Sequence, residues 1–122
     1  MMIDRDWGER FAHEWIEAWN SHDLERVFSH YVDDFEMSSP LIVERMKVPS
    51  GVLRGKAAIR PYWSWALERQ PPLKFELLGV FAGIDRIGIH YRSVGRRLAV
   101  EVLTFNAARE VTHGAALWGD PG

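Results

Sequence analysis

Apolar residues in the first half of the chain recur every three or four positions, the period of a helix with one buried face. In residues 6–20 the large side chains are spaced at i+4, namely Trp7, Phe11, Trp15 and Trp19. In residues 24–31 the apolar positions follow i, i+3, i+4, i+7, namely Leu24, Val27, Phe28 and Tyr31. A third helix is predicted over residues 56–69, where Pro61 must either delay the start of the helix or kink it.

After the second helix, which Asp33-Asp34 are expected to end, the pattern predicts strands. Residues 35–38 alternate between apolar and polar side chains and form a short strand that Pro40 stops. Residues 40–55 contain two prolines and two glycines and are predicted as a long loop, with a possible strand at 41–44. Further strands are expected at 74–82, 86–93, 97–105 and 110–118, joined by short turns into an antiparallel meander and followed by a loose tail at 119–122.

Helices followed by strands predict an α+β fold in which a curved sheet wraps around three N-terminal helices. At 122 residues, of which 47% are hydrophobic and 26% charged, residues 1–122 are expected to form one globular domain. The net charge of −2, with scattered arginines, argues against a nucleic-acid partner. The lack of cysteine excludes thiolate metal sites and cysteine nucleophiles. The chain starts without a signal-like apolar segment and has no membrane-spanning run, so we expect a cytoplasmic protein without a membrane partner.

Glu101 is the main candidate for chemistry. It lies in the middle of residues 98–105, a stretch that otherwise reads as a strand buried on both faces. A buried carboxylate without a partner has a raised pKa and can then act as an acid near neutral pH. The alternative is that Glu101 faces solvent or pairs with a nearby arginine; the candidates are Arg86, Arg92 and Arg97.

Two stretches, FAHEWIEAWNSHDLERVFSHYVDDFEMSSP and LRGKAAIRPYW, together with this order of elements, resemble the NTF2-like superfamily. The resemblance is closest to its SnoaL-like and ketosteroid-isomerase-like branch and covers about residues 8 to 119. It implies an open cone with an apolar pocket, and a homodimer formed through the outer face of the sheet. It does not imply one activity, because this fold hosts isomerases, cyclases, dehydratases and binding modules.

Ketosteroid isomerases are the standard example of proton transfer in this fold. An Asp base moves the proton, and a Tyr and a protonated Asp stabilise the enolate. By alignment, the Tyr position falls at Trp15, the base at Ser39 and the protonated acid at Glu101, with a supporting Tyr near Trp63. The resemblance therefore implies an inward-facing Glu101. It also implies loss of the base, because a serine without a neighbouring His or Lys does not accept a proton at neutral pH.

An inward-facing Glu101 would have Ala99 and Leu103 beside it on the same face of the strand. A four-residue loop before the last strand would place Gly114 nearly opposite Glu101, with Ala116 and Trp118 on the same face. These small residues would either leave space for a ligand or accommodate the helices.

The hairpin before Glu101 decides its other neighbour. A two-residue loop would bring His90 to its face and make an acid–base pair. A loop of three or four residues would bring Tyr91 there and make two donors for an oxyanion, which the apolar run Ile87, Ile89 and Tyr91 favours.

The predicted catalytic residues are thus Glu101, Tyr91 and His90. The aromatic residues could wall a pocket or simply form the core, and the predicted ligand-binding residues are Trp15, Trp19, Tyr31, Met37, Ser39, Trp63, Leu103, Gly114, Ala116 and Trp118. The histidines show no ligand spacing with carboxylates, so we expect neither a metal nor a cofactor. One hypothesis is a proton-transfer enzyme that takes a small apolar or aromatic molecule and is an isomerase, cyclase or dehydratase. The other is a non-catalytic module for ligand binding or dimerisation.

Overall fold

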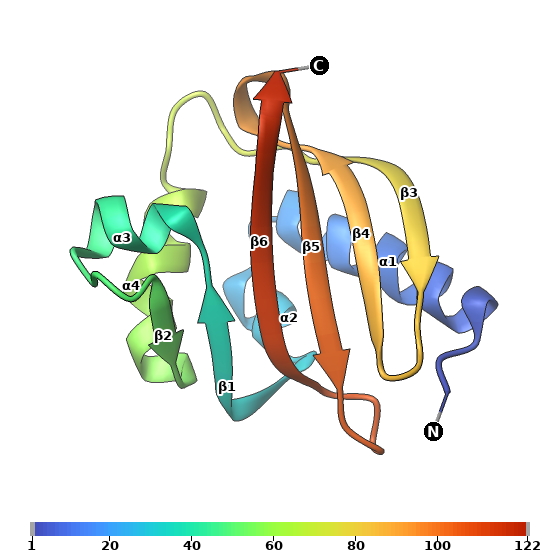
Figure 1. The fold of residues 1–122 in the computed structure, drawn as a ribbon. Helices are drawn as coiled ribbons and strands as arrows, with labels where there is room; N and C mark the ends of the chain where they lie inside the picture. Colours follow the sequence, from blue (N-terminus) through green and yellow to red (C-terminus); the bar gives the residue numbers. More distant parts are fainter. Residues whose placement is uncertain (1, 122) are drawn as a thin grey trace.

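The structure, a computed structural model, describes residues 2–121 of the chain. It has one six-stranded sheet in the order β2-β1-β6-β5-β4-β3 (Figure 1). The strands are β1 (Tyr31–Ser38), β2 (Val52–Arg54), β3 (Glu76–Ala82), β4 (Arg86–Arg92), β5 (Arg97–Phe105) and β6 (Val111–Pro121). The helices are α1 (Arg5–Asn20), α2 (Leu24–Phe28), α3 (Pro40–Met46) and α4 (Lys56–Leu67), with a short 3-10 turn, η1 (Val94–Arg96).

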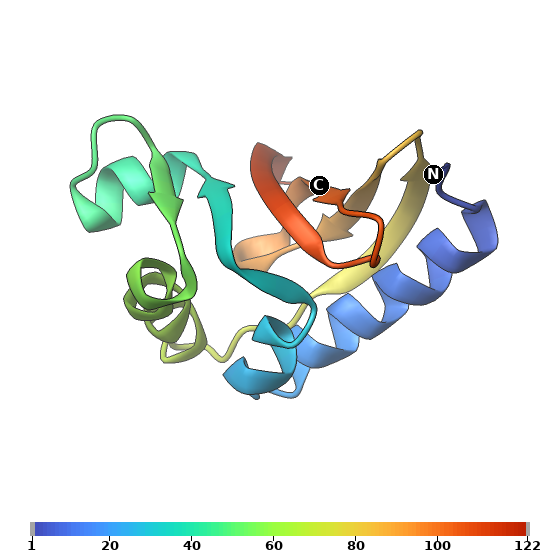
Figure 2. The same cartoon turned by 90° about the horizontal axis from the view of Figure 1, so that it is seen from below.

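The sheet is curved, and α1, α2 and α4 lie on the same side of it (Figure 2). The strands β3 to β6 are antiparallel neighbours, so the predicted meander is confirmed. Only the pairing of β1 with β6 is parallel among the described strands, which makes the sheet mostly antiparallel. The α+β prediction is therefore confirmed.

The first helix forms where the i+4 aromatic spacing predicts it. Asp4 caps α1 by accepting a hydrogen bond of 3.1 Å from the backbone N–H of Asp6. The face that carries Phe11, Trp15 and Trp19 is buried, as expected for an amphipathic helix packed on a sheet.

The helix count differs from the prediction, because the segment expected to be a loop with a strand at 41–44 contains α3. Ser39 caps this helix through its side-chain oxygen, which accepts from the N–H of Leu41, and Pro40 occupies the first helical turn. Proline is favoured at that position because an N–H group in the first helical turn has no acceptor within the helix, so its absence breaks no hydrogen bond. The Ser-Pro pair is thus a helix start rather than a strand stop followed by a loop.

The boundary between α2 and β1 also differs from the prediction. Helix α2 ends at Phe28, and the first residue of β1 is Tyr31, so Asp33 and Asp34 lie inside a strand. Both aspartates are exposed, in a strand whose Tyr31, Phe35 and Met37 are buried. Helix α4 spans Pro61 from Lys56 onward, so the helix does not start late.

The segment after residue 118, predicted as a loose tail, continues β6. Pro121 pairs in register with Arg97, and the Arg97 Nε donates a hydrogen bond of 3.1 Å to the carbonyl oxygen of Gly119. Sheet pairing therefore orders this segment up to residue 121.

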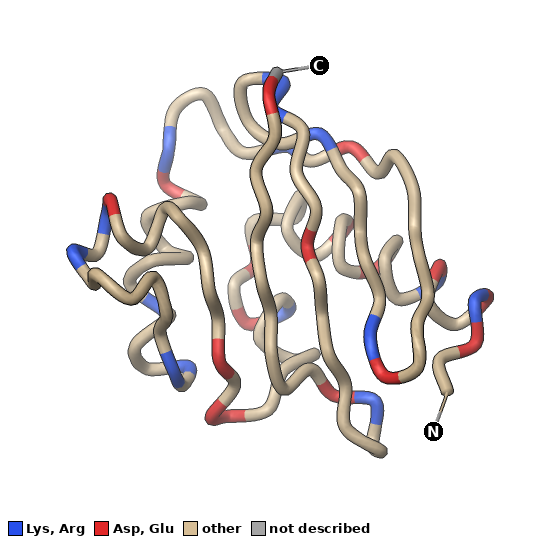
Figure 3. The backbone as a smooth tube through the Cα atoms, in the orientation of Figure 1, with Lys and Arg blue, Asp and Glu red and all other residues tan. Residues whose placement is uncertain are grey.

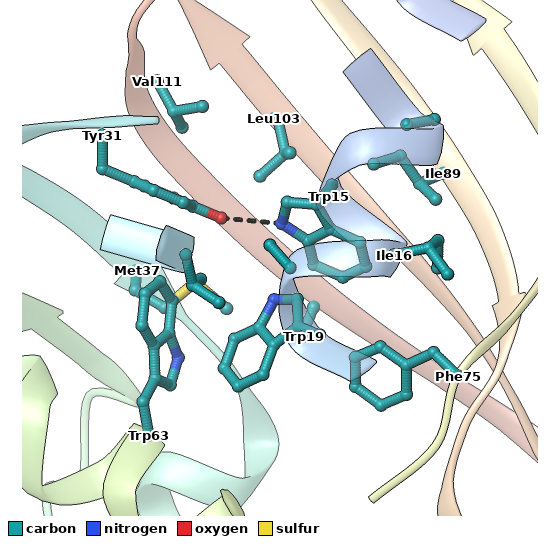
Figure 4. Packing of buried hydrophobic residues seen from close by; sticks show 14 of the residues in the cluster. Trp15, Ile16, Trp19, Tyr31, Met37, Trp63, Phe75, Ile89, Leu103 and Val111 are labelled. Atoms are coloured by element: carbon teal, nitrogen blue, oxygen red, sulfur yellow. Dashed lines mark hydrogen bonds between the residues drawn. The ribbon is translucent and has the colours of Figure 1, made fainter. Parts of the chain in front are cut away.

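Aromatic side chains dominate the core between the helices and the sheet (Figure 4). The Trp19 and Trp63 rings meet edge to face with centroids 5.0 Å apart, and Trp15 packs edge to face on Tyr91 at 5.3 Å. Within residues 2–121, no helix combines the length and apolar character needed to cross a membrane. A cytoplasmic location stays a prediction.

Candidate functional site

Glu101 is buried on the helix-facing side of β5, with only 3% of its surface exposed. Its strand neighbours on the same face, Ala99 and Leu103, are buried as well. Glu101 is the middle residue of β5 (Arg97–Phe105). In Figure 3, the acidic segment midway along β5 has no basic segment beside it on the described parts of β4 and β6. The inward-facing prediction for Glu101 agrees with this geometry.

The three arginines considered as partners of Glu101 bind elsewhere. Arg86 pairs with Asp85 at 2.8 Å and Arg92 with Glu76 at 3.3 Å, and Arg97 donates to the Gly119 carbonyl. The alternative of a surface salt bridge is therefore wrong. The carboxyl group enters the core without a cation to neutralise it.

Tyr91 is the polar neighbour of Glu101, and its hydroxyl donates a hydrogen bond of 3.4 Å to Oε1. Ile89 lies directly opposite Glu101 in the β4–β5 register, and Tyr91 lies opposite Ala99 on the same face. His90 pairs with Val100 on the other face, so the prediction of a His90–Glu101 acid–base pair is wrong. If the pairing of β4 with β5 were shifted by one residue, His90 rather than Tyr91 would lie on the face of Glu101.

On the other side of Glu101, the residue directly opposite is Ala116, while Gly114 lies opposite Leu103 and Trp118 opposite Ala99. The prediction that Gly114 faces Glu101 is thus wrong by two residues, although all of these side chains share one face. The register changes between Thr104 and Phe105, where β6 carries an irregularity. Loop length alone did not reveal that irregularity.

The glycine at 114 makes room for a side chain of the core. A Cβ atom there would lie 3.0 Å from the sulfur of Met37 and 3.9 Å from Oε2 of Glu101. Of the two roles considered for the small residues, Gly114 therefore accommodates packing. Ala116 lines the cavity described below.

Burial raises the pKa of Glu101 from its ordinary value of 4.5 to about 8, and the hydrogen bond from Tyr91 opposes this shift only in part. The carboxyl group is therefore mostly protonated at neutral pH. Burial also raises the pKa values of Tyr31 and Tyr91, and a negative charge on Glu101 would raise both further. Around neutral pH the cluster is a set of neutral hydroxyl and carboxyl groups that can donate hydrogen bonds.

Glu101 and Tyr91 border a small cavity of about 60 Å³ between the sheet, α1 and α4. A cavity needs about 10–15 Å³ to hold one water molecule, so this space holds several waters. Eight of the predicted site residues line it, namely Trp15, Trp19, Met37, Trp63, Tyr91, Glu101, Ala116 and Trp118. The other predicted residues, Tyr31, Ser39, Leu103, Gly114 and His90, lie outside its lining.

Two of these outer residues support the cavity wall. The Tyr31 hydroxyl accepts a hydrogen bond of 2.9 Å from the indole nitrogen of Trp15, which fixes that ring (Figure 4). The Ser39 hydroxyl accepts from Trp118 at 3.4 Å and from Tyr62 at 3.3 Å, besides capping α3. Ser39 therefore ties three elements together and has the environment of a structural cap.

The mouth of the cavity contains residues that the helical spacing did not single out. Tyr62 and Trp65 of α4 line it, together with Arg69 just past α4 and Val94 of η1. Trp65 stacks on Tyr62 with ring centroids 6.2 Å apart. The sequence signal was the run Tyr62 to Trp65 itself, three aromatic residues in four positions, which gives α4 a wide aromatic face.

Within residues 2–121, no three His, Asp or Glu side chains gather closely enough to hold a metal ion. The expectation that the protein uses neither metal nor cofactor stays a prediction.

Comparison with known proteins places the chain in a family. The SnoaL-like domain family matches residues 12–118. A SnoaL-like protein of unknown function from Burkholderia thailandensis is 45% identical, with 98% of this chain and 99% of that chain covered and a TM-score of 0.94. No curated protein sequence matches significantly.

More distant structures share the fold. An epoxide hydrolase/cyclase-like enzyme of salinomycin pyran ring formation, SalBIII, is 17% identical, with 95% and 93% of the two chains covered and a TM-score of 0.72. An NTF-2 like protein of unknown function from Burkholderia xenovorans is 20% identical, with 97% and 88% covered and a TM-score of 0.72. From the family match over residues 12–118 and the 45% identical relative, this chain belongs to the SnoaL-like domain family.

Proposed function

We propose that the protein is a cofactor-free proton-transfer enzyme for a small molecule that enters the cavity beside Glu101. The observation that carries this proposal is a protonated carboxyl group, with a raised pKa and a tyrosine donor, in the wall of an aromatic cavity. Groups with strongly perturbed pKa values in a cavity are typical of catalytic sites. The fold resemblance to a cyclase-like enzyme is consistent with such chemistry.

One carboxyl group is sufficient for this chemistry. Neutral Glu101 would donate its proton to a carbonyl or leaving hydroxyl oxygen of the ligand. The carboxylate that forms would then take a proton from a neighbouring carbon, so that Glu101 ends protonated again. This sequence balances for an isomerisation or a dehydration and needs no second base, which agrees with the structural role of Ser39. Between the two proton transfers, the Tyr91 hydroxyl would stabilise the negative charge of the Glu101 carboxylate.

The size of the cavity limits the size of the ligand that can enter it. With about 60 Å³ enclosed, only a few atoms of a ligand fit inside, and the remainder would lie at the mouth between α4 and η1. A ligand as large as a steroid would require the mouth to open.

The test compares the wild type with Glu101→Gln, which keeps the shape and removes the proton. Small aromatic and carbonyl compounds are screened by thermal shift, and ligands that stabilise the fold are incubated in D₂O and analysed by NMR for exchange or conversion. We expect conversion by the wild type and a loss of at least about 100-fold in the variant, the typical contribution of acid–base catalysis. Unchanged turnover in Glu101→Gln would rule out the assignment.

A non-catalytic ligand-binding module is the second candidate, because the position of the family's base is held by the cap residue Ser39. It predicts ligands that stabilise both proteins equally and remain unconverted in D₂O. We also propose a homodimer through the outer face of the sheet, where Leu117 is 53% and Phe81 66% exposed.

A further inference from the structure

Arg69 is a cation at the mouth of the cavity without a carboxylate partner. It follows the C-cap of α4, is half-buried and lines the cavity. Its guanidinium carbon lies 5.0 Å from the centre of the Trp65 ring. Some arginines of the chain pair with carboxylates, for example Arg26 with Glu14 and Arg60 with Glu25, whereas no ion pair reaches Arg69 among residues 2–121.

The field of Arg69 extends into the cavity. Burial raises the pKa of Tyr62, whose hydroxyl bonds to Ser39, and the positive charge of Arg69 opposes that rise. A guanidinium offers a planar fork of donors that matches a carboxylate, and its charge is present at every physiological pH. Arg69 is thus positioned to bind an anionic group of a ligand at the mouth.

Deeper in the cavity, Trp19 has an unpartnered hydrogen-bond donor. Its side chain is 95% buried, and its indole nitrogen has no hydrogen-bond partner within the described residues. The neighbouring indoles differ, since Trp15 donates to Tyr31 and Trp118 to Ser39. In Figure 4 the nitrogen edge of Trp19 is turned toward the Trp15–Tyr31 pair.

A buried donor without an acceptor is unfavourable, and a hydrogen bond to an oxygen atom of a ligand would offset that cost. Trp19 lines the same cavity as Arg69, so the two observations concern one space. The interior also carries the Tyr91 hydroxyl and the Glu101 carboxyl group. The wall of the cavity therefore contains hydrogen-bond donors, and a cation lies at its entrance, which favours a ligand with several acceptor atoms.

We propose that the ligand is a small carboxylic acid with a second oxygen function, a carbonyl or hydroxyl group a few carbons away. Its carboxylate binds Arg69 at the mouth, and its second oxygen accepts hydrogen bonds from Trp19 and from the Tyr91–Glu101 pair inside. This inference rests on the proposed function for the site, and it names the substrate class. Arg69 is then the residue that selects negatively charged ligands over neutral ones.

The test measures binding by isothermal titration calorimetry at pH 7 with the full chain. The probes are 3-oxo, 4-oxo and 3-hydroxy acids of four to eight carbons, each paired with its methyl ester. We expect at least one acid to bind about 10- to 100-fold more tightly than its ester, the range of a charge-assisted hydrogen bond. Arg69→Gln should abolish this preference, and Arg69→Lys should retain part of it.

Arg45→Gln is the matched control. The Arg45 guanidinium lies over the same Trp65 ring, 4.6 Å from its centre, but Arg45 is exposed and does not line the cavity. Basic positions on α3 and just past α4 are visible in Figure 3. This variant changes the net charge equally and should keep the preference for acids. Trp19→Phe should weaken the binding of acids and esters alike. It removes the indole N–H that donates to the second oxygen of the ligand, and both kinds of compound carry that oxygen.

The inference is overturned if no acid in the panel binds, if acids bind no more tightly than their esters, or if the preference survives in Arg69→Gln. These results are independent of turnover. An Arg69-dependent preference without conversion in D₂O would uphold the inference and refute the enzyme. Conversion that depends on Glu101 without a preference for acids would do the opposite.

Discussion

At the scale of single residues, burial changes the ionisation of the Glu101 carboxyl group. A buried carboxylate is disfavoured by loss of hydration, so the folded protein binds a proton that the unfolded chain releases. The groups that face it are Tyr91, which donates a hydrogen bond, and Tyr31 and Tyr62, whose pKa values are also raised by burial. These hydroxyls stay neutral around pH 7, so Glu101 is the titrating group of the cavity wall.

This proton makes stability depend on pH. The pKa of Glu101 is about 8 in the folded protein against an ordinary 4.5. Its contribution to stability is therefore complete below about pH 4.5, falls as the pH rises and levels off above about pH 8. The slope has an upper limit of about 1.4 kcal/mol per pH unit.

Glu101→Gln removes this slope. Urea unfolding of both proteins at pH 5, 6, 7 and 8 should show the stability difference shifting in favour of the variant as the pH rises. Contributions from other titrating groups cancel in the comparison. Parallel curves for the two proteins would show that Glu101 titrates normally.

Tyr91→Phe should raise the pKa of Glu101 further. The hydroxyl of Tyr91 opposes the effect of burial by stabilising the carboxylate, and the variant loses it. The measurement is a ¹³C NMR titration of the glutamate side-chain carboxyl. Tyr62→Phe is the control, because that hydroxyl bonds to Ser39 and should leave the Glu101 midpoint unchanged. A lower midpoint in Tyr91→Phe would contradict the prediction.

At the scale of elements, helix α3 depends on one side chain. Ser39 is 4% exposed, caps α3 and accepts hydrogen bonds from Tyr62 on α4 and Trp118 on β6. Ser39 is thus a junction between three elements. Its geometry holds the two side chains that border the cavity mouth.

Ser39→Ala should destabilise the protein by about 2 kcal/mol, because it removes the helix cap and leaves buried donors without an acceptor. Urea denaturation at pH 7 measures the change. Ser50→Ala is the control: Ser50 is exposed and its hydroxyl accepts only a 3.3 Å bond from the N–H of Val52. A loss below about 0.5 kcal/mol in Ser39→Ala would show that solvent replaces these bonds.

At the scale of the whole molecule, the two faces of the sheet have different roles. Helices α1, α2 and α4 cover one face, on which the cavity lies, whereas the other face carries Leu117 opposite Val100 in the centre of the meander. Exposed apolar side chains on a sheet face are typical of an interface. The proposed homodimer would bury them.

Leu117→Glu should therefore reduce a dimer to a monomer, because a buried like-charge pair would replace an apolar contact. Size-exclusion chromatography with light scattering at about 100 μM detects the change in mass. Ile84→Glu is the control, since Ile84 is 67% exposed but lies in the turn between β3 and β4. A monomeric wild type at that concentration would rule out the dimer.

Much of the fold follows from local pattern. The i+4 aromatic spacing specified α1, and the alternation after residue 74 specified the meander, because each element must bury one face. Glu101 stood out in the same pattern as an acid among apolar neighbours, but the strand pattern left open whether it faces solvent, and only the family resemblance implied that it points inward. Helix α3 was missed because its Ser-Pro start was interpreted as a strand end, although both residues are also typical of a helix start.

The site required the tertiary structure. The β4–β5 register decided that Tyr91, not His90, contacts Glu101, and the irregularity at Phe105 decided that Ala116, not Gly114, lies opposite it. A strand has the same alternation in either register, so only pairing with its neighbours chooses between them. The sequence alone determined most of the elements and singled out Glu101 as an acid among apolar neighbours. The cavity, its size and the cation at its mouth arose only where α4 packs against the sheet, because they depend on contacts between segments far apart in the chain.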